Sequence, residues 1–444
     1  MDTNDNKMLY NDRRTFIKNS AILAGGIMLS GVPSGVYANG SGVIKIALIG
    51  CGGRGTGATV QALTTKFNLK LVAMADVFRD NIDKSYEALF TKFGKEKVDV
   101  PEDKKFVGFD AYKLAIAEAD VVLLTTSIGF RPLHFEEAVR QNKHVFMEKP
   151  VAVDAPGIRK VLAAAAEAKR KKLNVVVGLQ RRYQKCYRDT IKRIHEGAIG
   201  DIVSGQVYWI SGGVWVRPRV AGQTEMEYQM RNWYYFNWLS GDHITEQHVH
   251  NLDVANWIKN SYPVSAQGTG SRFLRTGKDT GEIFDNHSIE FKYADGTILS
   301  SHCRHYEGTM NRVDETFQGT KGKVYLSANH TSTGIITNHK GLVLYNHAGQ
   351  ADPDPYQTEH DELFGAVNAG KYVYADAERA AKSTMTAILG RFASYSGKEI
   401  KWDDAINSEI TMMPERLAWD VNPKVMPDAN GNYPHAIPGK TKVI

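Results

Sequence analysis

The fold follows from one stretch of the chain, Val43-Ile-Lys-Ile-Ala-Leu-Ile-Gly-Cys-Gly-Gly-Arg-Gly-Thr-Gly57. Its first half is rich in β-branched and apolar residues, which is typical of a buried parallel strand. Gly50, Gly52 and Gly55 follow at the spacing of a dinucleotide-binding fingerprint. Such glycines allow a tight turn, close approach of the backbone to a pyrophosphate, and close packing of a helix on the strand. The stretch therefore predicts strand, turn and helix, with the pyrophosphate at the helix N-terminus.

Strand and helix patterns alternate from residue 43 to about residue 180. Strands are expected at residues 44–49, 70–75, 106–108, 121–126, 144–147 and 174–179, and helices at 54–66, 80–93, 133–141 and 157–171. Continuous apolar strands such as Val121 to Leu124 suit a parallel sheet that is covered on both faces. Right-handed βαβ units are expected, and the Gly-rich turn lies in the context that its fingerprint requires.

The character of the sequence changes after residue 180. Alternating, β-branched and aromatic runs occur at residues 202–211, 265–273, 286–293, 297–306, 312–318 and 323–326, and helical patterns at about 184–196, 244–259 and within 358–395. Asp295-Gly296 and the tripeptide at 320–322 are hairpin turn signals. The expected fold class is α/β: an N-terminal Rossmann doubly wound parallel sheet, plus a C-terminal α+β domain with a large, mostly antiparallel open sheet.

Four segments are expected: an export signal at 1–40, a Rossmann domain at 41–180, a substrate and oligomerisation domain at 181–402, and an irregular tail at 403–444. Arg13-Arg14-Thr15-Phe16-Ile17-Lys18 precedes a weak apolar stretch, and Val36-Tyr37-Ala38 suits a signal peptidase. These features predict a twin-arginine signal, a periplasmic protein and an encounter with the twin-arginine export machinery. The alternative is a disordered basic tail with a chance pair of arginines.

Composition excludes several classes of protein. Hydrophobic residues make up 42% and charged residues 23% of the 444 residues, as in an ordinary globular protein. The net charge of +6 is spread among acids, so nucleic-acid binding is not expected. Three distant cysteines form no disulfide framework and no metal-type spacing. No apolar run reaches the ~18 residues that a membrane span needs, so no stable span is expected in the mature chain.

Asp76 follows the second expected strand at the distance where a carboxylate accepts hydrogen bonds from the adenosine ribose. Its charge would repel a 2′-phosphate, which favours NAD over NADP. Arg79 lies close enough to leave NADP open. The alternative for Asp76 is an ordinary loop aspartate or a helix N-cap.

Two further groups of residues could carry chemistry. Lys149 ends the fifth strand, where it can hydrogen-bond a substrate hydroxyl, and Pro150 suits a cis bond. Glu246, His250 and Asp253 fall at i, i+4 and i+7, which is one face of a single helix and suits proton removal from an alcohol. No metal site is expected, because histidines two apart on a helix point to different sides; His243 and His248 are interpreted as structural.

A cluster of aromatic and polar residues between 209 and 238 suits a sugar, whose C–H faces stack on rings. Arg231 and Trp233 are the favoured substrate contacts, with core or subunit-interface packing as the alternative. Arg181 and Tyr183 begin the second domain beside the crevice, where they either contact substrate or brace the domain junction.

Taken together, these residues resemble the glucose–fructose oxidoreductase / inositol dehydrogenase / MocA (Gfo/Idh/MocA) family over nearly all of residues 43–400. The specific marks are the turn at 50–55, Asp76, His134, the run at 143–150 ending in Glu148-Lys149-Pro150, the run at 180–183, and the run from Glu246 to Asp253. The resemblance implies Rossmann-plus-open-sheet architecture, sugar-like substrates, and homo-oligomers such as dimers or tetramers.

The resemblance also implies roles for individual residues. His250 would be the general acid/base, Lys149 would orient and polarise the hydroxyl, and Glu246 stands where the family has aspartate. Asp253 joins the substrate contacts. The expected cofactor site comprises Gly50, Gly52, Gly53, Arg54, Gly55, Asp76, Thr126, His134, Glu148 and Lys149.

The expected function is an exported NAD(P)-dependent oxidoreductase that acts on a secondary alcohol or ketone of a sugar, glycoside or polyol. Export of a folded protein suggests that the nucleotide is bound before transport and scarcely exchanges. One alternative is an NAD-dependent glycosidase that works by transient oxidation and elimination. Another is a non-catalytic saccharide-binding protein, which the intact Lys149 and His250 disfavour.

Overall fold

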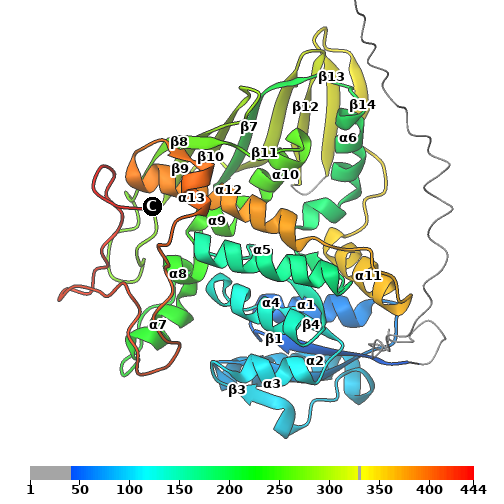
Figure 1. The fold of residues 1–444 in the computed structure, drawn as a ribbon, viewed down its shortest axis with the longest axis vertical. Helices are drawn as coiled ribbons and strands as arrows, with labels where there is room; N and C mark the ends of the chain where they lie inside the picture. The colour runs from blue at the N-terminus through cyan, green and yellow to red at the C-terminus, as the bar shows by residue number, and fades with distance from the viewer. Residues whose placement is uncertain (1–41, 329–331) are drawn as a thin grey trace, which may run out of the picture. The chain divides into compact units, whose positions relative to one another are not determined.

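The computed structural model describes residues 42–328 and 332–444 (Figure 1). The expected export signal lies outside these described residues. The chain forms a six-stranded and a nine-stranded sheet. None of the helices in the described part of the chain is both long and apolar enough to cross a bilayer.

The first sheet is entirely parallel, with the order β3-β2-β1-β4-β5-β6. This is the order of a doubly wound dinucleotide-binding fold and confirms the expected fold class. Its strands are β1 (Ile44–Ile49), β2 (Leu69–Asp76), β3 (Lys105–Val107), β4 (Val121–Leu124), β5 (His144–Met147) and β6 (Val175–Val177).

Helices cover both faces of this sheet, which explains why its strands are continuously apolar. Along β1, Ile46 and Leu48 belong to one core cluster, whereas Ala47 and Ile49 belong to another. The helical elements are α1 (Gly53–Thr64), α2 (Arg79–Lys97), η1 (Glu102–Lys104), α3 (Ala111–Ala117), η2 (Ile128–Phe130), α4 (Arg131–Arg140) and α5 (Ala155–Arg170).

The second sheet has the order β14-β13-β12-β11-β7-β10-β9-β8-β15. Every pairing is antiparallel except that of β7 with β10. The expected turn at Asp295-Gly296 joins β9 to β10. The strands are β7 (Ile202–Ser211), β8 (Ser265–Ser271), β9 (Asn286–Lys292), β10 (Ile298–His305), β11 (Arg312–Gly319), β12 (Gly322–Ser327), β13 (Thr333–Asn338), β14 (Val343–Asn346) and β15 (Ile400–Lys401).

The remaining helices connect the two sheets. They are η3 (Gln180–Tyr183), α6 (Lys185–His195), α7 (Glu225–Arg231), η4 (Trp233–Tyr235), α8 (Asn237–Ser240), α9 (His243–Glu246), α10 (Val249–Lys259), α11 (Pro355–Asn368), α12 (Ala377–Ser396) and α13 (Trp402–Ile406). The long helix α12, orange in Figure 1, packs on α5, α10, β8 and β9. Helix α11 instead contacts α1, β5 and β6.

The single helix expected at 244–259 is wrong, because α9 ends at Glu246 and α10 begins at Val249. The amide of His248 donates to the carbonyl of His243 at 3.2 Å, five residues back, so the regular ladder is interrupted. Glu246 and His250 therefore do not lie on one continuous helical face. After α13, the chain runs to residue 444 without further helix or strand.

The Gly-rich turn is shaped by close backbone contacts. Gly50 has φ +95°, and a Cβ there would lie 2.5 Å from the backbone nitrogen of Thr126. A Cβ on Gly55 would lie 2.0 Å from the carbonyl oxygen of Gly50. At Gly52 and Gly53 a Cβ would meet no protein atom within 4 Å. The fold therefore requires glycine at positions 50 and 55, whereas Gly52 and Gly53 leave open space beside the backbone.

Gly55→Ala is expected to lower the free energy of unfolding by about 1–3 kcal/mol, because the new methyl group overlaps the Gly50 carbonyl. Gly53→Ala, two residues away with open space around the added methyl group, is the matched control and should leave stability nearly unchanged. Urea unfolding monitored by circular dichroism measures both. Equal stabilities of the two variants would contradict the packing role of Gly55.

Candidate active site

The carboxyl ends of the parallel strands carry the expected cofactor residues. Helix α1 starts directly after the turn, and its N-cap, Gly52, makes no side-chain capping hydrogen bond. The first turn of α1 contains no acidic residue. Its backbone N–H groups therefore face outward as a positive helix end, which suits a pyrophosphate.

Asp76 lies at the end of β2, beside this helix end. One carboxylate oxygen accepts from the amide of Cys51 at 2.7 Å, and the other accepts from the amide of Phe78 at 2.9 Å and from Asn81 at 3.3 Å. Burial raises the pKa of Asp76, while these hydrogen bonds lower it. The side chain is therefore held at the turn, where the sequence places the adenosine ribose.

Arg54, in the first turn of α1, contacts Glu148, which directly follows β5. The Arg54 Nε donates to Glu148 Oε1 at 2.5 Å, and its Nη2 lies 3.5 Å from Glu359 Oε1 on α11. The ring of Tyr356 lies 5.1 Å from the guanidinium carbon. Burial, and then the charge of Glu148, raises the pKa of the Glu359 carboxyl. Arg54 thus connects α1, β5 and α11, a role that the sequence did not indicate.

His134 lies buried behind the end of β4. Its Nδ1 is 3.3 Å from Thr126 Oγ1, and its ring packs 4.2 Å from that of Tyr112. Burial, and then the charge of Arg131, lowers the pKa of His134 to about 3, so the ring is neutral. Arg131 donates to the carbonyls of Thr126 and Pro150, which ties the ends of β4 and β5 together. Sequence reasoning missed Arg131, because only its burial distinguishes it from a surface arginine.

Lys149 contacts Glu246 across the two sheets. The Lys149 Nζ donates to Glu246 Oε1 at 2.9 Å and to the Glu246 backbone oxygen at 2.6 Å. Both side chains are 14% exposed, so the pair borders solvent without being surrounded by it. The Lys149–Pro150 bond is cis, as the sequence suggested.

His250 lies at the start of α10, and its ring is stacked on Trp209 with centroids 6.0 Å apart. Burial, and then the charges of Lys149 and Arg181, lowers the pKa of His250 well below its usual value. The imidazole is therefore neutral and able to accept a proton at neutral pH. Lys149 contacts Glu246, and His250 lies four residues after Glu246, in the first turn of α10.

Arg181, Tyr183 and Asp253, which were expected to contact substrate, have structural partners. Their partners lie far away in the chain and join separate elements. Arg181 pairs with buried Glu315, the Tyr183 hydroxyl donates to Asp376 at 2.5 Å, and Asp253 accepts from Arg182 at 2.7 Å and from Ser383 at 2.8 Å. For Arg181 and Tyr183, these contacts agree with the alternative that the two residues brace the domain junction.

Arg231 ends α7, and Trp233 begins η4. Arg231 forms ion-pair hydrogen bonds with Asp80 at 2.8 and 3.0 Å, and its guanidinium lies 3.6 Å from the centre of the Phe78 ring. Trp233 packs edge-on against Trp215, which is 42% exposed. Arg231 thus joins α7 to the segment that follows Asp76.

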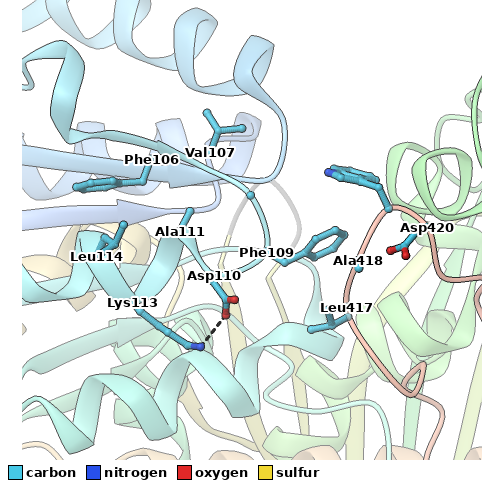
Figure 2. Close-up of a pocket in the computed structure, with 12 residues that line it drawn as sticks. Phe106, Val107, Phe109, Asp110, Ala111, Lys113, Leu114, Leu417, Ala418 and Asp420 are labelled. Atoms are coloured by element: carbon cyan, nitrogen blue, oxygen red, sulfur yellow. Dashed lines mark ion pairs between the residues drawn. The ribbon is translucent and has the colours of Figure 1, made fainter.

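A separate open cavity of about 840 Å³ lies between β3, α3 and the C-terminal tail (Figure 2). Phe109 and Trp419 both line it, and their rings pack against each other with centroids 4.8 Å apart. The Trp419 ring also lies 5.5 Å from that of Phe78, two residues beyond Asp76. None of the expected catalytic residues lines this cavity, so it is not the centre of the chemistry.

The histidines near α9 point to different partners. His243 Nδ1 lies 2.7 Å from Asp242, whereas His248 Nε2 lies 2.7 Å from Ser301. Both rings are fully buried. Their contacts agree with the structural interpretation of these two residues.

Two family models match this chain. One is the oxidoreductase family with an NAD-binding Rossmann fold, at residues 44–177, and the other is the Gfo/Idh/MocA C-terminal domain, at residues 187–325. Together they cover the parallel sheet, most strands of the second sheet and more than half of the sequence.

Similar proteins include inositol 2-dehydrogenases. That of Serratia proteamaculans is 28% identical over 369 residues, which are 80% of this chain and 95% of that protein. That of Rhizobium meliloti is 25% identical over 283 residues, which are 63% of this chain and 74% of that protein.

Solved structures share the fold. Scyllo-inositol dehydrogenase from Lactobacillus casei, with bound NAD(H) and scyllo-inositol, superposes with a TM-score of 0.61 at 19% identity, covering 82% of this chain and 100% of that one. Aldose–aldose oxidoreductase from Caulobacter crescentus gives 0.61 at 17% identity, covering 81% and 99%. The family models, the open helix end and Asp76 together lead to one conclusion: the chain belongs to the Gfo/Idh/MocA family of NAD-binding oxidoreductases.

Proposed function

We propose that this protein is a dehydrogenase that transfers hydride between NAD and a secondary alcohol or ketone of a sugar, glycoside or related polyol. The observation that carries the proposal is the contact of Lys149 with Glu246 beside a neutral His250. The inositol 2-dehydrogenases among the relatives support a polyol-like substrate.

The cofactor cradle fits a dinucleotide. The open faces of Gly52 and Gly53 and the uncapped start of α1 would receive the pyrophosphate, and Asp76 would bind the adenosine ribose. When bound, NAD supplies the hydride acceptor of the reaction.

The side chains divide the proton chemistry between them. The Lys149 ammonium donates a hydrogen bond to the substrate oxygen and stabilises the negative charge that develops there. Glu246 keeps the ammonium in place by accepting a hydrogen bond from its Nζ, with an N–O distance of 2.9 Å. His250, being neutral, accepts the hydroxyl proton during oxidation and returns it during reduction.

We further propose that the protein acts in the periplasm and keeps its nucleotide through many turnovers. Arg13 and Arg14 with the following Phe16 support export in the folded state. Free dinucleotide is scarce outside the cytoplasmic membrane, so a protein that retained its nucleotide would need an oxidising as well as a reducing substrate. A second sugar carbonyl or another electron acceptor would complete such a cycle.

Lys149→Met should lower kcat by at least about 100-fold, because the variant cannot stabilise charge on the substrate oxygen. Bound NAD should remain. Lys143→Met, at the opposite end of β5, is the matched control and should keep near-normal activity. Nicotinamide absorbance with a panel of sugars and inositols measures the effect, and full activity of Lys149→Met would remove the catalytic assignment.

Freshly purified protein should release about one NAD per chain on heat denaturation, and added nucleotide should exchange over hours. Gly52→Ala should reduce the retained nucleotide without changing the stability of the nucleotide-free protein, since its methyl group meets no protein atom but enters the cradle. Nucleotide content near zero in the native protein, together with rapid exchange, would refute retention. The same preparation tested on nitrophenyl glycosides distinguishes the glycosidase, which alone would release nitrophenol.

Replacing Arg13 and Arg14 together by lysine should abolish appearance of the protein in the periplasmic fraction, because the twin-arginine pair is the recognised element. Lys18→Arg is the control and should be exported. Cell fractionation with immunoblotting measures both. Unchanged export of the double variant would exclude this route.

A further inference from the structure

A second group of chemistry-bearing side chains lies away from the nucleotide cradle, between α6 and the connection that follows β14. Cys186 is in the first turn of α6, His347 directly follows β14, and Asp352 precedes α11. The cysteine sulfur, one imidazole nitrogen and one carboxylate oxygen all lie within 4.8 Å of one another. Cys186 and His347 are buried, and the Asp352 side chain is 11% exposed.

His347 presents an unsatisfied nitrogen to this group. Its Nδ1 lies 3.1 Å from the Tyr345 hydroxyl, which fixes the ring. Its buried Nε2 has no hydrogen-bond partner among residues 42–328 and 332–444 and lies 3.9 Å from Asp352 Oδ2, too far for a hydrogen bond. A buried polar atom of this kind is costly unless it has a ligand.

The surroundings of Cys186 favour a cation. The Asp352 carboxylate accepts hydrogen bonds from the backbone amide of Cys186 at 3.4 Å and from the Gln184 side chain at 3.2 Å, so it is held beside the cysteine. A cation between the sulfur and the carboxylate would offset the negative charge of Asp352.

We propose that Cys186, His347 and Asp352 bind one zinc ion, with a fourth position left for solvent. Thiolate, imidazole and carboxylate are all zinc ligands, and ligand atoms in a tetrahedral zinc site lie roughly 3.5 Å apart. The 3.9 Å between His347 and Asp352 is already close to this separation. The hydrogen bond between His347 Nδ1 and the Tyr345 hydroxyl is the kind of outer contact that zinc-binding histidines commonly make.

The ion would have a structural consequence. The segment from 347 to 354 connects β14 to α11, and α11 supplies Tyr356 and Glu359 beside Arg54. Zinc would fasten this connection to α6 and so hold α11 against the Gly-rich turn. The site requires neither substrate nor nucleotide, so its test is independent of the proposed dehydrogenase activity.

The test begins with protein purified without a metal column, whose metal content is measured by mass spectrometry. About one zinc per chain is expected in the native protein. Cys186→Ser and His347→Gln should each lose most of it, whereas Cys303→Ser, at a buried cysteine on β10, should keep it. Equal zinc in native protein and both site variants, or none in the native protein even after incubation with zinc, would overturn the proposal.

Cobalt substitution identifies the sulfur ligand without depending on whether the variants fold. Native protein stripped with a chelator and loaded with Co²⁺ should show a thiolate-to-cobalt charge-transfer band in the near ultraviolet. Removing the metal should lower the thermal midpoint, and adding zinc should restore it. Absence of the charge-transfer band at saturating cobalt would exclude Cys186 as a ligand and refute the site.

Discussion

The contact between Lys149 and Glu246 is the constraint around which the molecule is arranged. Lys149 follows a strand of the parallel sheet, and Glu246 ends a short helix of the second domain. Their atoms meet at 2.9 Å only because the two sheets are held in a fixed relation by α12, which packs on α5 as well as on β8 and β9. The charged pair would be costly in the interior without such precise support, since each partly buried ion needs its partner.

Several other buried contacts join distant parts of the chain around this pair. Arg181 pairs with Glu315, and Arg182 pairs with Asp253. Removing one partner from such a pair leaves an uncompensated buried charge, which costs far more than the pair contributes. These pairs therefore stabilise the frame that positions Lys149, Glu246 and His250. Among their members, Asp253 was expected to touch substrate, and Arg181 either to do so or to brace the domain junction.

The sequence predicted the parallel sheet well, because strands buried on both faces are continuous apolar runs and the Gly-rich turn has a distinctive spacing. Helix α3 escaped prediction, since its seven residues span only two turns. Strand β13 escaped because its apolar residues are limited to Ile335 and Ile336, and β14 escaped because it has only four residues. The break between α9 and α10 depends on one shifted hydrogen bond, which periodicity cannot reveal.

The sequence predicted which types of residue form the site, but it did not predict which other residues they contact. Lys149 and His250 stand in recognisable sequence contexts. Nothing in the sequence could place Glu315 against Arg181 or Glu359 against Arg54, because such pairs are separated by more than a hundred residues and depend on the complete fold.

The position of α11 gives the nucleotide cradle an unusual dependence on the whole chain. Arg54 and Glu359 are roughly 300 residues apart, and α11 reaches the turn only after the chain has passed through the strands from β7 to β14. The contact between Arg54 and α11 is therefore present only in a chain that is folded through residue 368. A nucleotide that binds only the folded cradle stabilises the association of the two halves of the chain. By thermodynamic reciprocity, that association strengthens nucleotide binding by the same free energy.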